Sequence, residues 1–523
     1  METEQVTRTR AYFISSFIMS LYLFLILGVF PLTYKYQYYE MDDWKYRFFR
    51  DTSMACVLVL FFFFFAVVLW RIEQDRWQET KKRVFYNISI LDKAVLLYFI
   101  STTVSFLLTD FKKECFSGSS GWYMGYLSQI LFVAVYFLVS RAWEFQYEYI
   151  VLLLAVSAVV FILGILHRFD VDILDIYGNL ALKYKIEFLS TIGQSSWYSS
   201  FLCTVFPLGL YLFFIADKGW IRLLSGIYSC LAMLTLVTQN TDSAFLCLAA
   251  VLLLLFYLAF DGQKQMRRFL QVLMLVSGSF TLMGLCQRWF SEEMIPLDSI
   301  SVFVSQGWVA PVTFGCLLVL YNCIKQPLSR KYFWIFVAVM GAVTVWMILF
   351  IVLNSTGVLR LWFGYQNVDN YLLFTDEWGN RRGFAWRFTC EAYMQQSVLQ
   401  KVFGIGPDGY YFYNKSIPEL AIQVRDFWGN LALTNAHNEY LTKLYNIGLV
   451  GLVSYIGMLG GAIYLFVKKR TEHILLPAFA ICVVSYMTHN IFCYEQVCCT
   501  PFTYILMGFG SNLIYNNVKK RTY

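Results

Sequence analysis

The chain alternates between long apolar runs and short polar connections over most of its length. Runs of about 18–22 apolar residues are long enough for an α-helix to cross the hydrocarbon core of a bilayer, and about fourteen occur. The pattern therefore predicts an all-α fold, a polytopic transmembrane helical bundle. The predicted spans are residues 11–31, 52–70, 91–108, 122–140, 149–166, 198–215, 223–239, 243–260, 269–285, 302–323, 333–353, 437–466, 474–492 and 497–515.

One polar interruption, residues 354–436, is far longer than a connection requires. Loops of this length are usually functional or structured. The chain therefore divides into spans 1–11 (residues 1–353), a large loop subdomain (354–436) and spans 12–14 (437–523). Within the loop we expect an amphipathic helix over 384–401 closing at Gly404, and a second helix running toward Trp428. Ser416 and Glu419 have the spacing of a capping box for that second helix.

The composition supports the membrane class. Hydrophobic residues make up 59% of the chain and charged residues 14%, and the mean hydropathy is +0.56, whereas soluble domains have roughly 45–50% apolar and 25% charged residues. A net charge of +7 needs no nucleic-acid partner, because cytoplasmic loops of membrane proteins are rich in Lys and Arg. The thirteen cysteines lack zinc-like spacing, and we expect neither a metal nor a cofactor. The first apolar run is long enough to span and lacks a cleavage site, so no cleavable signal is expected.

The basic residues predict the orientation of the chain. They recur at alternate connections, which places both termini in the cytoplasm and the 354–436 loop outside. The span cores carry few ionisable side chains, which argues against an ion-coupled path across the bilayer. The basic residues used are Arg8, Arg10, Arg71, Arg76, Lys81, Lys82, Arg83, Lys264, Arg267, Arg268, Lys325, Arg330, Lys331, Lys468, Lys469, Arg470, Lys519, Lys520 and Arg521.

Arginines gather in the long loop. Arg381, Arg382 and Arg387 surround Trp386 near the start of its first predicted helix, and Arg425 stands near the end of the second. Guanidinium groups match phosphate oxygens in bidentate fashion, so this cluster is a candidate site for a lipid diphosphate. The alternative is that these arginines only reach lipid headgroups at the membrane surface.

His437 stands where the long loop meets the twelfth predicted span. On a continuous helix it shares one stripe with Leu441, Leu444, Gly448 and Gly451, and the two glycines would let a partner backbone approach closely. Histidine can serve as a base, an acid or an oriented hydrogen-bond donor near neutral pH. The alternative is a histidine that only caps the helix or packs at an interface.

Three motifs resemble those of a known family. His437 and Asn438 are followed by nine residues and then by Gly448-x-x-Gly451. Upstream, Arg382-x-x-x-Trp386 precedes Val402-Phe403-Gly404-Ile405-Gly406-Pro407, and Thr191-Ile192-Gly193-Gln194 leads into the sixth predicted span. Together, mainly over residues 190–515, they resemble the bacterial O-antigen ligase and O-antigen polymerase superfamily of multi-pass enzymes that act on polyprenyl-diphosphate-linked glycans.

The chain departs from that family at two places. Members often carry Ser-Arg after the seventh span, and that arginine is assigned to diphosphate binding, whereas this chain has Asn240-Thr241-Asp242-Ser243. Ligases that load lipid A frequently have Thr-Thr after the glycine motif, whereas Leu452-Val453 follows here. The second departure favours the polymerase over the ligase.

The resemblance implies an inverting, metal-independent glycosyltransferase of the bacterial cytoplasmic membrane with its site on the extracytoplasmic face. Arg382, with Arg387 in reserve, would hold the diphosphate, and His437 would orient or deprotonate the acceptor hydroxyl. Arg381, Trp386, Asn438 and Arg425 would contribute to substrate binding.

The expected partners are a polyprenyl-diphosphate-linked glycan, an acceptor glycan, the lipid bilayer and a chain-length regulator protein. Two alternatives stay open. One is a ligase that transfers a finished glycan to a lipid, protein or wall acceptor, and the other is a lipid-linked oligosaccharide flippase or other transporter, which should show two related halves.

Overall fold

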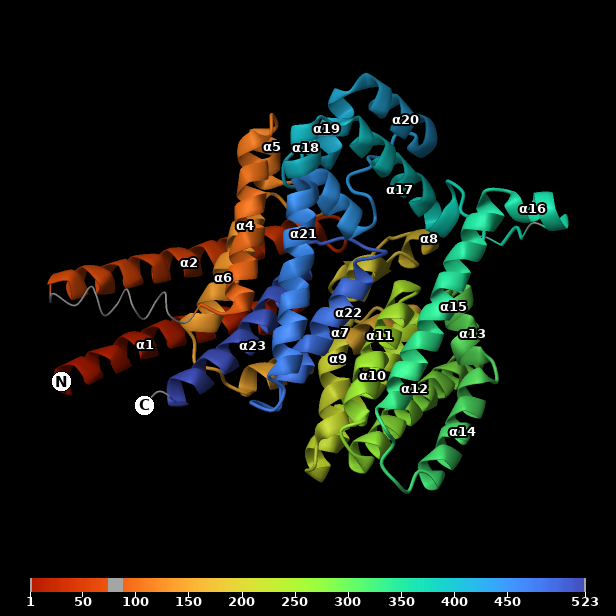
Figure 1. Ribbon diagram of the computed structural model, residues 1–523, viewed down its shortest axis with the longest axis horizontal. Helices are drawn as coiled ribbons and strands as arrows, with labels where there is room; N and C mark the ends of the chain where they lie inside the picture. The colour runs from red at the N-terminus through yellow and green to blue at the C-terminus, as the bar shows by residue number, and fades with distance from the viewer. Residues whose placement is uncertain (1, 74–87, 366, 370, 522–523) are drawn as a thin grey trace.

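The computed structural model describes residues 2–73, 88–365, 367–369 and 371–521 (Figure 1). The N-terminal half runs through helices α1 (Glu2–Leu23), η1 (Phe24–Val29), η2 (Phe30–Leu32), α2 (Met41–Glu73), α4 (Ile90–Leu108), α5 (Lys112–Ser117), α6 (Tyr126–Arg141), α7 (Glu148–Arg168), α8 (Leu182–Lys185), strands β1 (Phe188–Leu189) and β2 (Gly193–Gln194), and helices α9 (Ser195–Ile215), α10 (Gly219–Thr238) and α11 (Ser243–Ala259). The remainder consists of α12 (Gln263–Trp289), α13 (Ser299–Gln306), α14 (Val309–Cys323), α15 (Lys331–Ser355), α16 (Val358–Phe363), α17 (Trp378–Gln395), α18 (Val398–Phe403), α19 (Tyr410–Ser416), α20 (Pro418–Trp428), α21 (Glu439–Lys468), α22 (Leu476–His489) and α23 (Thr500–Arg521).

The predicted all-α membrane class is confirmed. Helices contain 74% of the residues, and the one sheet of the described chain is the two-residue pairing of β1 with β2. Within the described residues, nine helices are long and apolar enough to cross a membrane, or ten if the bent pair α13 and α14 counts as one span. The chain is therefore a multi-pass membrane protein.

The predicted number of fourteen spans is not confirmed. Every predicted span coincides with a helix, but α6, α11 and α22 have 16, 17 and 14 residues. At about 1.5 Å per residue they fall short of the roughly 30 Å of the hydrocarbon core. α23 is long enough to span but is not apolar enough over its length, since it carries Asn, Lys and Arg in its last turns.

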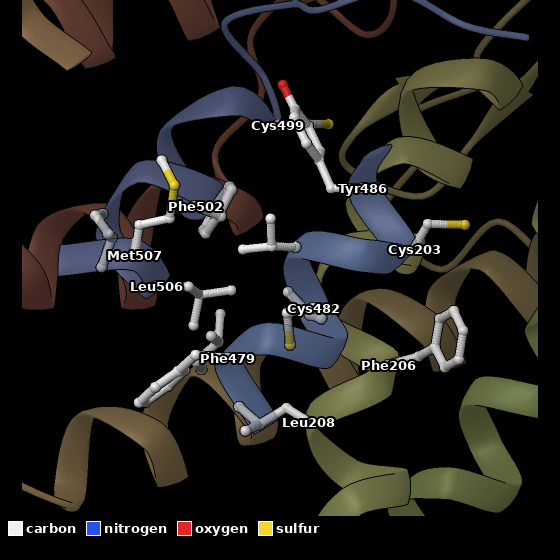
Figure 2. Packing of buried hydrophobic residues seen from close by; sticks show 14 of the residues in the cluster. Cys203, Phe206, Leu208, Phe479, Cys482, Tyr486, Cys499, Phe502, Leu506 and Met507 are labelled. Atoms are coloured by element: carbon white, nitrogen blue, oxygen red, sulfur yellow. The ribbon is translucent and has the colours of Figure 1, made fainter. Parts of the chain in front are cut away.

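One hydrophobic core runs through the bundle from α1 to α23. Figure 2 shows its centre, where α22 packs between α9 and α23. Phe479, Cys482 and Tyr486 of α22 are buried against residues of α9 such as Phe206 and of α23 such as Phe502. The short α22 is thus an interior helix, whereas α15 leaves its apolar surface uncovered.

Three of the predicted cytoplasmic loops meet at one end of the bundle. Arg330 forms an ion pair with Asp261, and Arg470 lies 3.6 Å from the same carboxylate. The α11–α12, α14–α15 and α21–α22 connections therefore share one side, as the positive charges predict. Arg76, Lys81, Lys82 and Arg83, which also carry that prediction, lie outside the described residues.

The long loop forms a compact cap over the opposite end of the bundle (Figure 1). Its helices α17, α19 and α20 enclose a second hydrophobic cluster, which also includes Tyr445 of α21. Phe384 stacks on Phe427 with the ring centroids 4.2 Å apart, which joins α17 to α20. The cap therefore has its own core and is anchored to the first turns of α21.

The helix limits inside the cap differ from those predicted. The expected helix over 384–401 is two helices, because Ser397 forms a capping box with Gln400 and starts α18 anew. α18 does close at Gly404, as predicted. The capping box predicted at Ser416 is wrong: the Ser416 hydroxyl donates to the Tyr413 carbonyl, and Pro418 opens α20, which ends at Trp428 as expected.

The predicted continuous stripe from His437 to Gly451 is also wrong. His437 lies outside α21 with φ 49°, and Gly448 breaks the helix with φ 71°. The break frees the Asn446 carbonyl, which accepts hydrogen bonds from the amides of Ile405 (3.0 Å) and Gly406 (2.9 Å). A Cβ on Gly448 would lie 2.3 Å from the Val402 carbonyl oxygen. The expected close approach of a partner backbone therefore occurs, but at a helix break.

We expect Gly448→Ala to lower the free energy of unfolding by at least about 2 kcal/mol, because alanine disfavours positive φ and its Cβ would clash with α18. Thermal unfolding of the purified protein in detergent, followed by tryptophan fluorescence, measures the effect. Gly457→Ala in the same helix is the matched control, since a Cβ there meets nothing within 4 Å. Equal stabilities of the two variants would contradict this account of the break.

Candidate functional site

The candidate site lies where the cap meets the bundle. Four segments converge there: α17 with Arg382, α20 with Trp428, the turn that carries His437 before α21, and the 490–499 connection between α22 and α23. The structure thus brings together the histidine and one arginine of the cluster that the sequence predicts.

His437 is held by its backbone and by rings. Its amide donates to the Asn435 side-chain oxygen at 2.8 Å, an Asx turn that supports the left-handed backbone. The imidazole is stacked with Trp428 at 6.1 Å between ring centroids and meets Tyr494 edge-on at 5.3 Å. Among the described residues no side-chain hydrogen bond occupies its ring nitrogens, so they are free to bind a ligand.

Arg382 is placed by an unusual turn. Gly379, Asn380 and Arg381 all have positive φ, and this left-handed turn reverses the chain just before Arg382. The guanidinium donates from Nε to the Phe492 carbonyl (3.0 Å) and from Nη1 to the Gly379 carbonyl (2.9 Å). In the described part of the chain it has no carboxylate partner. A partly buried positive charge without a counter-ion is a candidate anion site.

The two groups interact electrostatically. Burial, and then the positive charge of Arg382, lower the pKa of His437 to about 3. The imidazole is therefore neutral at physiological pH and can accept a proton or a hydrogen bond. An anion bound at Arg382 would offset the guanidinium charge and raise the pKa of His437 again.

The other predicted arginines have different surroundings from Arg382. Arg387 is exposed and clamped by Asp376 (2.7 Å) and Glu391 (3.0 Å), which raise its pKa. Arg425 is exposed, and its Nε lies 3.9 Å from the carboxylate of Asp426. Arg381 lies over the Trp428 ring at 5.6 Å, at the rim of the site. Arg387 is thus a structural ion-pair residue and a poor reserve for Arg382.

Trp386 and Asn438 support the site in different ways. The Trp386 ring stacks on Phe492 at 5.9 Å, beside the carbonyl that holds Arg382, and its buried indole N–H has no hydrogen-bond partner within the described parts of the chain. Asn438 is the N-cap of α21, and its side-chain oxygen accepts from the Leu441 amide at 3.0 Å. Asn438 therefore fixes the helix start next to His437.

Aromatic rings form the walls of the site. Trp122 packs against Tyr494 at 4.6 Å and against Trp197 at 5.9 Å. The buried indole N–H groups of Trp386 and Trp428 lack a hydrogen-bond partner among the described residues. Flat apolar faces combined with free donors are suited to a sugar or a phosphate ester.

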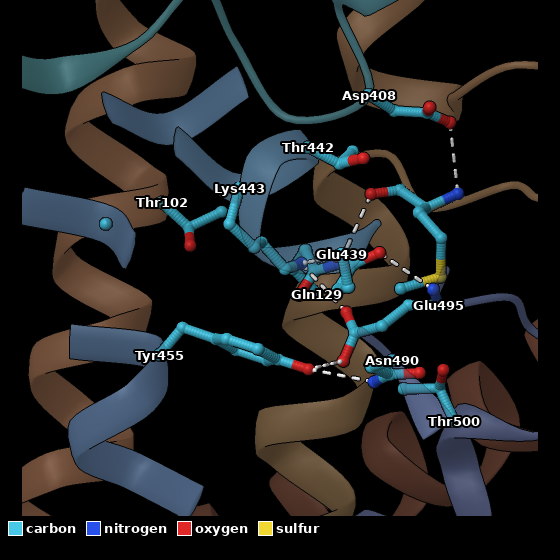
Figure 3. A network of polar contacts seen from close by, with 12 residues as sticks. Thr102, Gln129, Asp408, Glu439, Thr442, Lys443, Tyr455, Asn490, Glu495 and Thr500 are labelled. Atoms are coloured by element: carbon cyan, nitrogen blue, oxygen red, sulfur yellow. Dashed lines mark hydrogen bonds and ion pairs between the residues drawn. The ribbon is translucent and has the colours of Figure 1, made fainter. Parts of the chain in front are cut away.

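A buried ion cluster joins the first turns of α21, which follow His437 in the chain, to Glu495 (Figure 3). The Lys443 ammonium is 2.8 Å from Glu495 and 3.2 Å from Glu439, and it also donates to the Tyr98 hydroxyl at 3.0 Å. The other oxygen of Glu495 accepts from Tyr455 (3.0 Å) and Tyr486 (2.8 Å). All three charged side chains are buried.

This cluster attaches the 490–499 connection to the start of α21. Glu439 donates its amide to the Asn490 carbonyl (2.9 Å) and accepts the Glu495 amide on its carboxylate (2.8 Å). Between these anchors lie Phe492, which holds Arg382, and Tyr494, which packs on His437. The cluster therefore anchors the connection that contacts both Arg382 and His437.

The cluster was not predicted from the sequence. Glu439 and Lys443 are buried in the first turns of α21, at the end of this helix, so the expectation of few ionisable residues in the span cores stays a prediction. Their i,i+4 spacing and the isolated acid Glu495 are the signals from which the cluster could have been predicted.

A small polar cavity adjoins the ion cluster. Its volume is about 30 Å³, and its lining includes Lys443, Asn446, Tyr494 and Asp408. Asp408 accepts from the amides of Ser119 (2.7 Å) and Met124 (3.1 Å), while burial raises its pKa to about 7. The space suits ordered water rather than a sugar, so the substrate would bind on the outer side of His437.

The 240–243 turn offers no arginine of its own, but Arg168 lies beneath it. The buried guanidinium of Arg168 donates to the carbonyls of Thr238 (2.6 Å), Ile186 (2.9 Å) and Lys185 (3.3 Å). These bonds hold the turn in place and leave Arg168 closed to a ligand. Arg168 therefore does not supply the second diphosphate-binding arginine that the family resemblance would imply.

No protein-family model matches the chain, and no curated protein matches it. Among the described residues, no group of three or more His, Cys, Asp or Glu side chains is placed to hold a metal ion. The case for function therefore rests on the residues and geometry described above.

The pairing of Arg382 with His437 can be tested by titration. In protein labelled with nitrogen-15 at its four histidines, we expect the His437 imidazole to stay neutral between about pH 5 and 8. Arg382→Gln should raise the pKa of His437, because it removes the nearby positive charge while leaving the burial. The measurement is the imidazole nitrogen shift against pH.

His437→Gln assigns the signal, and Arg425→Gln is the control for loss of a distant exposed arginine. A His437 that titrates near its reference value of about 6.5 in the unaltered protein, or that does not respond to Arg382→Gln, would refute the arrangement.

Proposed function

We propose that this protein is a membrane glycosyltransferase that polymerises polyprenyl-diphosphate-linked oligosaccharides into a surface polysaccharide. The observation that carries the proposal is the pairing of an unneutralised guanidinium, Arg382, with a neutral imidazole, His437, inside aromatic walls. The motif resemblance around these two residues supports the same assignment.

The proposed reaction divides the work between the two groups. The acceptor hydroxyl oxygen attacks the anomeric carbon of the donor sugar, and the bond from that carbon to the diphosphate oxygen breaks with inversion. The electron pair leaves with the diphosphate, where charge grows in the transition state and Arg382 stabilises it. The hydroxyl proton passes to His437.

The donor itself would make His437 a better base. Without an anion its pKa is lowered to about 3, which is too acidic for efficient proton abstraction at neutral pH. The diphosphate charge beside Arg382 would raise that pKa. Proton abstraction would then be favoured only when the donor is bound.

The site would lie on the extracytoplasmic face of the cytoplasmic membrane. The support for this side is the basic loop cluster at the opposite end of the bundle, around Asp261. The polysaccharide would then grow on the extracytoplasmic side of the membrane, where a chain-length regulator could contact it.

A ligase would use the same donor chemistry with a different acceptor, and Leu452-Val453, where such ligases carry Thr-Thr, favours the polymerase.

A lipid-linked oligosaccharide transporter is the second alternative class of protein. The buried Lys443 cluster resembles the ion pairs of transport paths. However, it lies at the end of α21 and its groups are fully engaged with one another, so it is better suited to a structural role.

We expect His437→Ala to lower polymer formation by roughly 10²–10⁴-fold through loss of the base. Arg382→Ala should lower it by roughly 10²–10³-fold through loss of transition-state stabilisation. A gel of surface glycan beside a membrane-expression blot measures both. Arg425→Ala is the matched control and should leave polymer at the unaltered level, since Arg425 is exposed and outside the site. Normal long-chain polymer in either His437→Ala or Arg382→Ala would refute the assignment.

A further inference from the structure

A basic hollow lies at the end of the bundle opposite the cap. It has a volume of about 390 Å³ and lies between the first turns of α10 and α12 and the last turn of α14. Its lining carries four cationic side chains, Arg222, Lys264, Arg267 and Arg268, together with Gln271 and Tyr321. Nothing in the proposed glycosyl transfer uses it.

The positive charge of this hollow is only partly neutralised. Asp217 forms ion pairs with Lys264 (2.6 Å) and Arg268 (2.5 Å). Arg222 donates to the uncharged Gln271 side chain, and Arg267 lies over the Tyr321 ring at 4.5 Å. Four cations thus share one carboxylate within the described residues, which leaves an excess of three positive charges.

Arg267 carries an unmet hydrogen-bond donor. Its Nε is buried and has no partner in the described part of the chain. An arginine that only reaches toward water at the membrane surface keeps its guanidinium hydrated. The buried Nε therefore favours a bound acceptor over simple exposure to solvent.

An apolar groove continues from the basic hollow along α10. It has a volume of about 470 Å³ and is lined by Phe213, Leu223, Gly226, Ile227 and Cys230, and it shares Arg222 with the hollow. Leu223 and Ile227 are more than half exposed, and the groove lies on predicted membrane spans. A Cβ on Gly226 would approach the Phe213 ring to 3.3 Å, so the absence of a side chain at this position leaves room in the groove.

We propose that the hollow and the groove together form a binding site for one anionic phospholipid. The negatively charged phosphate would sit among Arg222, Lys264, Arg267 and Arg268 with the headgroup beside it, and an acyl chain would follow the groove beside Gly226. Basic pockets between membrane helices are typical sites for anionic headgroups.

Because the hollow and the groove meet at Arg222, a phospholipid fits the combined site better than a soluble phosphate does. A small anion would fill the hollow and leave the apolar groove without an occupant. A phospholipid has a charged head and an apolar chain in the same order as the two hollows. Its phosphate would join α10 to α12 through the cations that each helix contributes. This site is independent of the proposed glycosyl transfer.

The test is native mass spectrometry of the purified full-length protein released from detergent with phosphatidylglycerol or phosphatidylcholine. We expect one tightly retained phosphatidylglycerol and no comparable phosphatidylcholine. Arg222→Gln with Arg267→Gln should weaken phosphatidylglycerol binding by roughly 30-fold, since each basic residue near an anionic lipid contributes roughly a factor of five.

The control pair is Lys325→Gln with Lys331→Gln, which makes the same charge change at two exposed positions, one in the α14–α15 connection and one at the start of α15. It should leave retention unchanged. Cys230→Trp, which narrows the groove without touching the cations, should weaken phosphatidylglycerol binding and leave binding of glycerol phosphate unaffected. Equal losses in both charge pairs, equal retention of the two lipids, or tight binding of glycerol phosphate alone would overturn the proposal.

Discussion

The arrangement of the candidate site depends on the buried contact between Lys443 and the two carboxylates of Glu439 and Glu495. Removing one partner from such a cluster typically costs about 3–5 kcal/mol, because the remaining charge is left uncompensated in the interior. The contact closes the 490–499 connection onto α21. Since that connection holds Arg382 through Phe492 and packs Tyr494 on His437, a change in the cluster would move both groups at once.

A second constraint comes from backbone that is kept in a rarely populated form. His437, Asn380 and Arg381 all have positive φ without being glycine. Such residues cost of order 1–3 kcal/mol each and persist where the surroundings hold them in place, commonly at functional sites. Here the cap keeps these residues in place. The glycine break in α21 lets the 404–406 turn of the cap form hydrogen bonds directly with the Asn446 carbonyl. Packing, strain and charge therefore converge on the same few residues.

The sequence was sufficient for the membrane class, the helical content and the long structured loop. It also singled out His437 and Arg382, whose catalytic roles stay predictions. Each rests on a local signal such as apolar run length or motif spacing. It was insufficient where long-range contacts decide. Arg387 is the reserve candidate beside Arg382 in the sequence, but Asp376 and Glu391 neutralise it. Trp428 and Tyr494 come from other segments, and the helix break at Gly448 follows from docking against α18, which periodicity does not show.

The proposed function requires Arg382 and His437 to transfer a glycan from a lipid diphosphate to an acceptor hydroxyl. The most direct measurement gives the purified protein, in lipid nanodiscs, only a polyprenyl-diphosphate-linked oligosaccharide and follows both products by mass spectrometry. The account predicts free polyprenyl diphosphate together with lipid-linked glycans lengthened by whole repeat units, and neither product with His437→Ala. An unchanged donor, in protein whose fold is shown to be intact by its thermal unfolding, would contradict it.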